Sequence, residues 1–245
     1  MMPPFMTRHI PNFITSLNLA SGFIAIILAL NGNAVTASWL ILAAMVFDFL
    51  DGFSARLLKA YSAVGKELDS LADVVSFGVA PAILIFRMLN SQTAFNGPGE
   101  NGFVDAKTAL LFLVPALMVI CAALRLAVFN VDTTQSTTFR GMPTPANALA
   151  VVSLVLAVHY SDSGIVQYIT TSPVIIIVLT LLLSGLMVSR IPLLSLKVTD
   201  LKLKGNEGRY LLVAFILLSF ILLGMSAIPL IIPLYLTASL LSLLF

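Results

Sequence analysis

The stretch DFLDGFSARLLKAYSAVGKELDSLAD, residues 48–73, concentrates carboxylates in a chain that otherwise has few of them. Asp48, Asp51, Glu67, Asp69 and Asp73 are five of the 11 acidic residues in the 245-residue sequence, of which only 10% is charged. Apolar runs flank the stretch on both sides, so we expect it to join two helices in apolar surroundings. A carboxylate there is costly unless a cation or hydrogen bonds compensate its charge. The cluster therefore needs a compensating partner.

The composition of the chain indicates that the lipid bilayer is its solvent. Hydrophobic residues make up 59% of the sequence and the mean hydropathy is +1.05, whereas a soluble domain has roughly a quarter of its residues charged. A bilayer admits helices because they satisfy their own backbone groups, so we expect an all-α, polytopic integral membrane protein. The net charge of +2 gives no reason to expect a nucleic-acid partner. The single Cys121 excludes an internal disulfide.

Eight apolar segments have the lengths expected of membrane-spanning helices. They cover residues 12–30, 36–57, 70–90, 108–129, 146–160, 172–189, 210–224 and 226–244. The last two are divided only by Gly224, Ser226 and Pro229, so a total of seven is the alternative. Lysine and arginine collect in the loops that follow the second, fourth and sixth segments. By the positive-inside rule, these loops and both termini are expected in the cytoplasm.

Helical geometry places the aspartates on two facing stripes. At about 100° per residue, four residues of the second segment fall within roughly 100° of one another: Asp48, Asp51, Gly52 and Ala55. Gly65, Asp69 and Asp73 recur at intervals of four and form a second stripe that leads into the third segment. A short basic connection joins the two helices, so we expect antiparallel neighbours that direct two carboxylates each toward one another near the cytoplasmic surface.

Four carboxylates in one place repel each other and lose hydration, at a cost of several kcal/mol. The same faces offer no stripe of lysine or arginine that could neutralise them. Hard divalent cations such as Mg²⁺, Mn²⁺ or Ca²⁺ take oxygen ligands, and Mg²⁺ is often shared with substrate phosphates. Two metals held by the aspartates would suit a phosphoryl-type displacement. Gly52, Ala55 and Gly65 would let a nucleotide approach the backbone closely, whereas Glu67 lies off the stripe and is expected to be solvated at the membrane surface.

The pattern Asp48-x2-Asp51-Gly52-x2-Ala55-Arg56-x8-Gly65-x3-Asp69-x3-Asp73 resembles, at every fixed position and spacing, the signature of the CDP-alcohol phosphotransferase family. The resemblance implies a core of six transmembrane helices, usually homodimeric, with the signature on the second and third spans. We therefore expect a membrane core over residues 1–205 and additional C-terminal transmembrane helices over residues 206–245.

The site residues of that family carry over to the matching positions. The resemblance implies that Asp48, Asp51, Asp69 and Asp73 bind two divalent cations, Mg²⁺ or Mn²⁺, on the diphosphate of a CDP-linked lipid. Asp73 would also act as the catalytic base that takes the proton from the acceptor hydroxyl. The expected nucleotide-binding residues are Asn12, Thr15, Asp48, Asp51, Gly52, Ala55, Arg56, Gly65 and Asp69. The first segment presents Asn12, Thr15, Asn18 and Gly22 on one face, which either lines the nucleotide pocket, as in relatives, or serves ordinary helix packing.

Residues 124–148, LRLAVFNVDTTQSTTFRGMPTPANA, bear on the acceptor alcohol. This segment resembles the stretch found in the bacterial and archaeal phosphatidylserine synthase branch of the family, through Arg125, Phe129, Asn130, Phe139, Gly141, Pro143, Pro145 and Ala146. It departs at Val128, where relatives often have a second arginine. The resemblance implies transfer of a phosphatidyl group from CDP-diacylglycerol to L-serine, by metal-dependent direct displacement, at the cytoplasmic side of a prokaryotic inner membrane. Arg125 or Arg140 could hold the serine carboxylate, and Asn130 or Asp132 its ammonium.

Other functions remain as alternatives. Glycerol 3-phosphate or inositol phosphate could be the acceptor, although a phosphate would call for a tighter basic group than Arg125 and Arg140. A cation-coupled membrane transporter would need acidic residues nearer the middle of the membrane and a route from outside. An intramembrane prenyltransferase would carry its two acidic motifs far apart in sequence, whereas here all four aspartates lie within residues 48–73.

Overall fold

The computed structural model describes residues 9–93, 106–131, 139–161, 164–193, 207–224, 227 and 230–241. Its helices and strands are α2 (His9–Leu30), α3 (Ala34–Leu57), α4 (Ala63–Asp73), η1 (Val74–Val79), α5 (Ala80–Thr93), α6 (Ala106–Val131), β1 (Phe139–Arg140), α7 (Thr144–Tyr160), α8 (Gly164–Thr171), α9 (Pro173–Val188), β2 (Pro192–Leu193), α10 (Glu207–Leu223) and α11 (Ile231–Leu241). The prediction of an all-α, polytopic membrane protein is confirmed, with one antiparallel pair of two-residue strands as the addition.

Each of the eight predicted membrane segments corresponds to helical structure among the described residues. By length and composition, His9–Leu30, Ala34–Leu57, Ala63–Ser91 and Thr108–Val131 can each cross a membrane, and α7, α9 and α10 are shorter apolar helices. Helix α10 ends at Leu223 and α11 begins at Ile231, and the total of seven or eight spans stays a prediction. The short helix α8 was not predicted. The division of the chain at residue 205 stays a prediction, since it falls outside the described residues.

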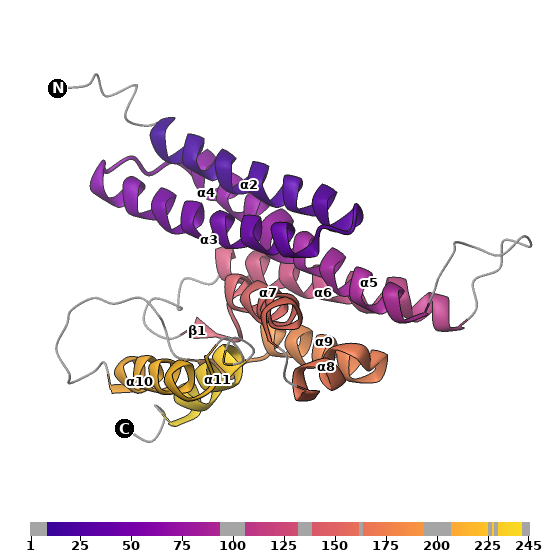
Figure 1. Ribbon diagram of the computed structural model, residues 1–245. Helices are drawn as coiled ribbons and strands as arrows, with labels where there is room; N and C mark the ends of the chain where they lie inside the picture. The colour runs from indigo at the N-terminus through magenta and orange to yellow at the C-terminus, as the bar shows by residue number, and fades with distance from the viewer. Residues whose placement is uncertain are drawn as a thin grey trace, which may run out of the picture.

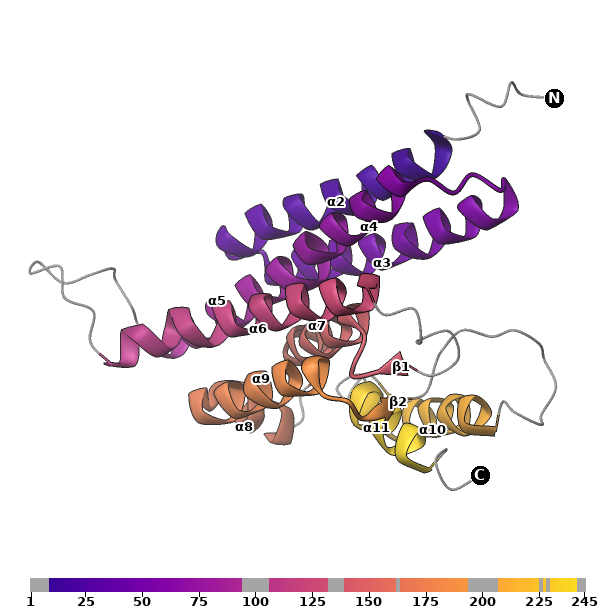
Figure 2. The same ribbon diagram turned by 180° about the vertical axis from the view of Figure 1, so that it is seen from behind.

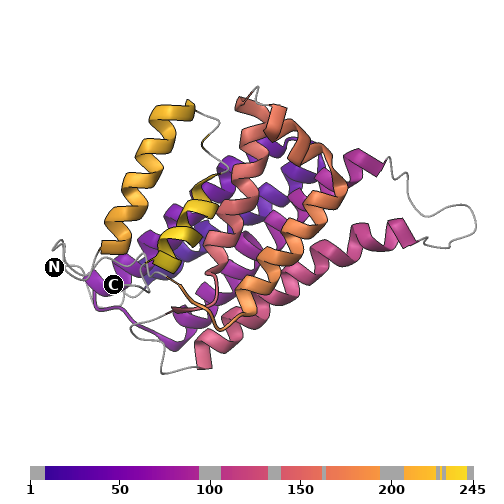
Figure 3. The same ribbon diagram turned by 90° about the horizontal axis from the view of Figure 1, so that it is seen from below.

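The helices pack side by side in a bundle. Helix α2 lies along α3 and α4. Helix α4 continues through η1 into α5, and η1 and α5 lie along α6 (Figures 1 and 2). Helix α7 contacts α3, α5 and η1, while α9 packs mainly on α6. Figure 3 shows α10 apart from the main bundle, with α11 on the side toward α7. The aspartate-bearing helices α3 and α4 therefore lie within the main bundle, and α10 lies outside it.

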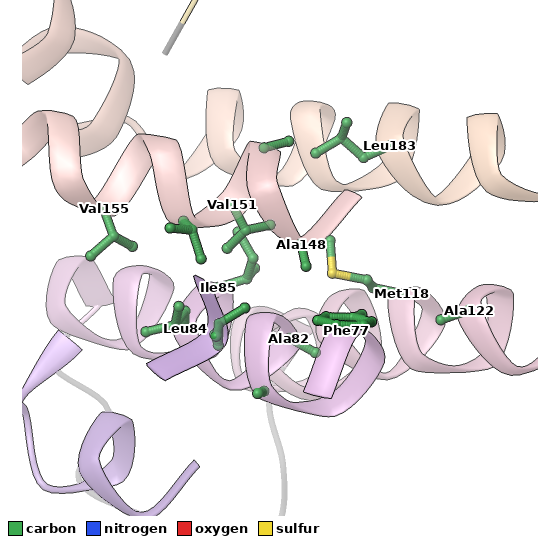
Figure 4. Close-up of a cluster of buried hydrophobic side chains, with 14 of the residues drawn as sticks. Phe77, Ala82, Leu84, Ile85, Met118, Ala122, Ala148, Val151, Val155 and Leu183 are labelled. Atoms are coloured by element: carbon green, nitrogen blue, oxygen red, sulfur yellow. The ribbon is translucent and has the colours of Figure 1, made fainter. Parts of the chain in front are cut away.

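Small residues let these helices approach closely. A Cβ atom built on Gly22 of α2 would lie 2.7 Å from Cα of Ser76, and one on Gly78 would lie 3.2 Å from Cβ of Ala122 in α6. Lipid tails are as apolar as leucine, so close packing rather than removal from water holds membrane helices together. Figure 4 shows the result, a cluster in which Phe77 and Met118 lie beside Ala148.

A π-helical turn interrupts the third membrane helix directly after Asp73. The sequence predicted one regular helix, but residues Val74–Val79 form the π-helix η1 between α4 and α5. A π turn has more residues than an α turn, so it rotates the side chains that follow it. Ser76 within this turn is buried, and its hydroxyl donates to the carbonyl oxygen of Asn18 at 3.0 Å. This hydrogen bond links α2 to the helical run that carries Asp69 and Asp73.

The start of α7 is fixed by a tight turn at Gly141, whose φ of +76° favours glycine. A Cβ atom there would lie 2.6 Å from the carbonyl oxygen of Met187, so the turn lies directly against the end of α9. The backbone N–H of Gly141 donates to the carbonyl of Ile191, and that of Met142 donates to the carbonyl of Leu186, both at 2.9 Å. These bonds hold the first turn of α7 at the same end of the bundle as the end of α6.

Candidate active site

Three aspartates converge between the C-terminal half of α3 and the helix α4 that follows it. Asp48 and Asp51 of α3 and Asp69 of α4 each offer a carboxylate oxygen, and the three oxygens lie within 4.8 Å of one another. Asp51 is buried, and Asp48 and Asp69 are half-buried. The regular helices make this possible, because the spacings of three and four residues hold their side chains on single faces.

Asp73 extends the same stripe by one turn, outside that group of three. It is 8% exposed and lies close enough to interact electrostatically with the other three aspartates. The structure thus brings together three of the four predicted metal ligands and places the fourth beside them, deeper in the bundle. Glu67, expected to be solvated, is exposed.

The donor set fits hard divalent cations. Like charges so close together need compensation, and carboxylate oxygens are the ligands that Mg²⁺ and Mn²⁺ prefer. Oδ1 of Asp69 is buried without a hydrogen-bond partner in the part of the chain that the structure describes. A buried acceptor without a partner is costly, and a bound cation would satisfy it.

Helix α2 holds two of the carboxylates in place. The Thr15 hydroxyl donates to Oδ2 of Asp51 at 2.6 Å, and it also lies 3.0 Å from the carbonyl of Pro11. Nδ2 of Asn18 donates to Oδ1 of Asp73 at 3.3 Å. The polar face of the first segment therefore contacts the acidic cluster directly. Asn18 was not among the predicted site residues, although its spacing of three from Thr15 placed it on the same helical face.

A cavity of about 350 Å³ opens beside the aspartates. Its lining residues are Pro11, Asn12, Thr15, Asp51, Gly52, Ala55, Arg56, Ala60, Tyr61, Ser62, Gly65, Lys66 and Asp69. All the predicted nucleotide-binding residues except Asp48 belong to this set. The structure therefore brings those residues together around one space. Of the polar face of α2, Asn12 and Thr15 line this cavity, whereas Gly22 serves helix packing against Ser76.

The two glycines of the cavity have different surroundings. A Cβ atom on Gly65 would lie 2.8 Å from Oδ1 of Asn12 and 2.9 Å from the Ser62 hydroxyl, so it would displace both side chains. A Cβ atom on Gly52 would meet nothing closer than Nη1 of Arg56 at 3.8 Å. Gly65 therefore preserves the positions of two cavity side chains, whereas Gly52 leaves space open inside the cavity.

Residues of the α3–α4 connection complete the cavity and were missed from the sequence. Ser62 precedes α4 in an extended conformation, and its hydroxyl accepts the backbone N–H of Gly65 at 2.9 Å. Serine before a helix is a strong N-cap signal, so this residue could have been found. Tyr61 and Lys66 also line the cavity, and no periodic pattern marked them.

The predicted acceptor residues are placed differently from one another. Arg125 is 9% exposed, its guanidinium lies 5.4 Å from the centre of the Phe129 ring, and it interacts electrostatically with Asp73. Asn130 is engaged elsewhere, because its Nδ2 donates to the Ser70 hydroxyl at 2.7 Å. The backbone of Arg140 lies in β1, but its side chain lies outside the described residues, as does Asp132. Of the described acceptor candidates, Arg125 is the one beside the expected catalytic base.

Fold and site define a polytopic helical membrane protein with a carboxylate cluster beside a nucleotide-sized cavity. The model of the family described as CDP-alcohol phosphatidyltransferase matches residues 8–188. The chain belongs to this family, and the match includes all four aspartates and the helices that position them.

Proteins similar to this chain come from archaea, bacteria and yeast. An archaetidylserine synthase from Methanothermobacter thermautotrophicus is 38% identical over 155 residues, which cover 62% of this chain and 60% of that protein. A CDP-diacylglycerol–serine O-phosphatidyltransferase from Bacillus subtilis is 36% identical over 184 residues, covering 75% of this chain and 89% of that protein. A protein of the same name from Saccharomyces cerevisiae is 36% identical over 167 residues, covering 62% of this chain and 55% of the yeast protein.

Proposed function

We propose that this protein transfers the phosphatidyl group of CDP-diacylglycerol to the hydroxyl of L-serine, giving phosphatidylserine and CMP. The observation that carries the proposal is the meeting of Asp48, Asp51 and Asp69 beside the cavity, with Asp73 one turn away. Serine as the acceptor is supported by the names of the bacterial and yeast relatives and by the position of Arg125 near Asp73.

Two divalent cations, Mg²⁺ or Mn²⁺, would be held by Asp48, Asp51, Asp69 and Asp73. Bound there, they would neutralise the diphosphate and stabilise the charge that develops on the departing CMP. The unpartnered Oδ1 of Asp69 supports this assignment. The cavity residues Asn12, Thr15, Gly52, Ala55, Arg56 and Gly65 would bind the CDP moiety, and Lys66 and Tyr61 would add to them.

The chain's own residues account for the acceptor step. Asn18 donates to one oxygen of Asp73 and orients the carboxylate, so that its other oxygen can take the proton of the serine hydroxyl. The serine oxygen then forms a bond to the phosphatidyl phosphorus as the bond from that phosphorus to CMP breaks. The proton ends on Asp73 and the negative charge leaves with CMP. No enzyme nucleophile is required, so we propose a single displacement.

The proposal includes an orientation in the membrane. Arg56 near the end of α3 and Lys66 near the start of α4 line the cavity, and Lys59 lies in the connection between these helices. Positive residues favour the cytoplasmic side, so the cavity would open to the cytoplasm and both termini would lie there. We further propose a prokaryotic inner membrane as the location and a homodimer as the working form, which the family resemblance supports.

Product formation by membranes that contain the protein tests the proposed function. CDP-diacylglycerol would be offered with labelled serine, glycerol 3-phosphate or inositol phosphate, each with Mg²⁺, with Mn²⁺ and with EDTA. We expect labelled phosphatidylserine with either metal and none with EDTA. If labelled lipid formed from glycerol 3-phosphate or inositol phosphate but not from serine, that alcohol would be the acceptor instead of serine. A wild-type protein that makes no lipid product would favour the transporter alternative.

A further inference from the structure

A second set of buried polar groups lies at the start of α7, outside the cavity described above. The side chains of Thr144 and Asn147 have no exposed surface. The Thr144 hydroxyl and both polar atoms of the Asn147 amide have no hydrogen-bond partner within the described residues. Nε of Arg125 in α6 is likewise buried and unpartnered. Buried polar atoms without partners are uncommon and cost free energy, so their presence together calls for an explanation.

Helical register places these groups toward the same end of the bundle as Asp73. In Figure 4, Phe77, Met118 and Ala148 lie in one cluster, and α6 runs antiparallel to both α7 and the η1–α5 run. From that cluster, Asp73 is about one turn back along its helix, Arg125 is about two turns further along α6, and Thr144 is about one turn back along α7. All three steps lead toward the same end of the bundle.

The side chains also share the faces that point into the bundle. Thr144 lies three residues before Asn147 and four before the buried Ala148, and Asn147 lies four residues before the buried Val151, so Thr144 and Asn147 share a face of α7. Arg125 is spaced in the same way from the buried Cys121 and Ala122 of α6, and it interacts with Asp73.

The chemistry of this cluster suits the two charges of an amino acid. Arg125 offers a cation and an unused N–H, and Thr144 offers an unused hydroxyl. The N-cap of α7 is Pro143, which supplies no side-chain cap, so the positive end of the helix dipole remains available to a carboxylate. Asn147 offers a free donor and a free acceptor, and its oxygen can accept a hydrogen bond from an ammonium group.

We propose that Thr144 and Asn147, with Arg125, are the residues that select serine as the acceptor, by binding its carboxylate and ammonium groups while its hydroxyl faces Asp73. This inference rests on the proposed function and assigns its acceptor specificity to two residues that the sequence did not single out. Tyr235 of the C-terminal helix α11 is buried and interacts with Arg125, which gives that helix a place at the edge of the same cluster.

Two nearly isosteric substitutions test the proposal, Thr144→Val and Asn147→Leu, which remove polar atoms and keep the volume nearly unchanged. A binding role predicts that KM for serine rises about tenfold or more in each, while KM for CDP-diacylglycerol stays within about twofold. The thermal midpoint in detergent should stay the same or rise, because an unsatisfied buried group is replaced by an apolar one. Thr144→Ser keeps the hydroxyl and should keep the wild-type KM for serine.

Matched controls come from the same membrane domain. Thr180 of α9 is equally buried, but its hydroxyl already donates to the carbonyl of Ile176 at 2.7 Å. Asn90 near the end of α5 has an unpartnered Oδ1 at the opposite end of its helical run from Asp73. Thr180→Val and Asn90→Leu should leave KM for serine unchanged.

The outcomes separate this inference from the proposed function. If the wild-type protein makes no phosphatidylserine from serine, the proposed function is overturned, and this inference with it. Wild-type protein that makes phosphatidylserine, with variants whose KM for serine is unchanged, would overturn only the inference. The inference would also be overturned if Thr144→Val and Asn147→Leu lose stability or raise both KM values equally, because the two polar groups would then serve the fold.

Discussion

The hydroxyl oxygen of Thr15 lies 2.6 Å from Oδ2 of Asp51, so the first membrane helix fixes the orientation of a carboxylate on the second. Removing the hydroxyl in Thr15→Val should lower kcat/KM for CDP-diacylglycerol about tenfold or more, since a hydrogen bond to a charged group is lost. Thr15→Ser should restore most of the activity. Ser16→Ala is the control, because the exposed Ser16 bonds only its own helix at the Asn12 carbonyl among the described contacts. If Thr15→Val were as active as the wild type, the hydrogen bond from Thr15 to Asp51 would have no role in catalysis or donor binding.

The metal ligands can be tested by removing one negative charge at a time. Asn at Asp48, Asp51 or Asp69 should abolish activity while the protein still inserts in the membrane, because an amide oxygen is a weaker ligand for a hard cation. EDTA should stop the reaction, and Mg²⁺ or Mn²⁺ should restore it. Glu67→Gln removes a charge from an exposed site on the same helix as Asp69 and should be neutral. Full activity in the chelator would rule out a metal-dependent reaction.

The sequence predicted the acidic cluster correctly because its residues lie in regular helices. Asp48 with Asp51, and Asp69 with Asp73, are local pairs on α3 and α4, so spacing alone placed them on shared faces. The residues expected to bind the nucleotide came from the resemblance to the family signature, and all of them except Asp48 line one cavity. The fold class followed from hydropathy, because a bilayer leaves helices and closed barrels as the ways to satisfy a buried backbone.

The features that the sequence did not predict depend on contacts between distant segments. The π turn after Asp73 accompanies the close approach of Gly22 to Ser76, which no local pattern encodes. The burial of Thr144 and Asn147 without hydrogen-bond partners depends on the register between α7 and its neighbours, which the spacing of residues within α7 does not reveal. Asn130 was expected at the acceptor, but its amide is engaged by Ser70 on the neighbouring helix.

The two cavity glycines should respond differently to alanine. Gly65→Ala would place a methyl group 2.8 Å from Oδ1 of Asn12 and 2.9 Å from the Ser62 hydroxyl. It should therefore lower activity, and it should lower the thermal midpoint as well, because the displaced Ser62 hydroxyl caps α4 by accepting the N–H of Gly65. Gly52→Ala meets no close atom, so it should keep the wild-type midpoint and raise KM for CDP-diacylglycerol several-fold by occupying the cavity. Measuring both midpoint and KM checks the contrast, and a normal midpoint for Gly65→Ala would contradict it.

A substitution at Asp73 can distinguish a role in proton transfer from a role in donor binding, because Asp73 lies outside the group of three carboxylates and interacts with Arg125. A serine hydroxyl is a poor nucleophile until a base takes its proton, and a positioned base contributes about two to four orders of magnitude. Asp73→Asn should therefore lower kcat by at least about two orders of magnitude. CDP-diacylglycerol should still bind with near-normal affinity, since Asp48, Asp51 and Asp69 remain. Loss of donor binding together with activity would instead make Asp73 chiefly a metal ligand.

The single-displacement mechanism also predicts how the wild-type protein behaves when serine is absent. Labelled CMP should not exchange into CDP-diacylglycerol, because no phosphatidyl group is stored on the enzyme between the loss of CMP and the arrival of the acceptor. Ser70 and Ser76 are the hydroxyls nearest to Asp73 in sequence, and both are engaged: Ser70 donates to the carbonyl of Lys66, and Ser76 donates to the carbonyl of Asn18. Rapid exchange would mean that a covalent phosphatidyl-enzyme forms, and Asp73 would then have to activate an enzyme nucleophile before serine.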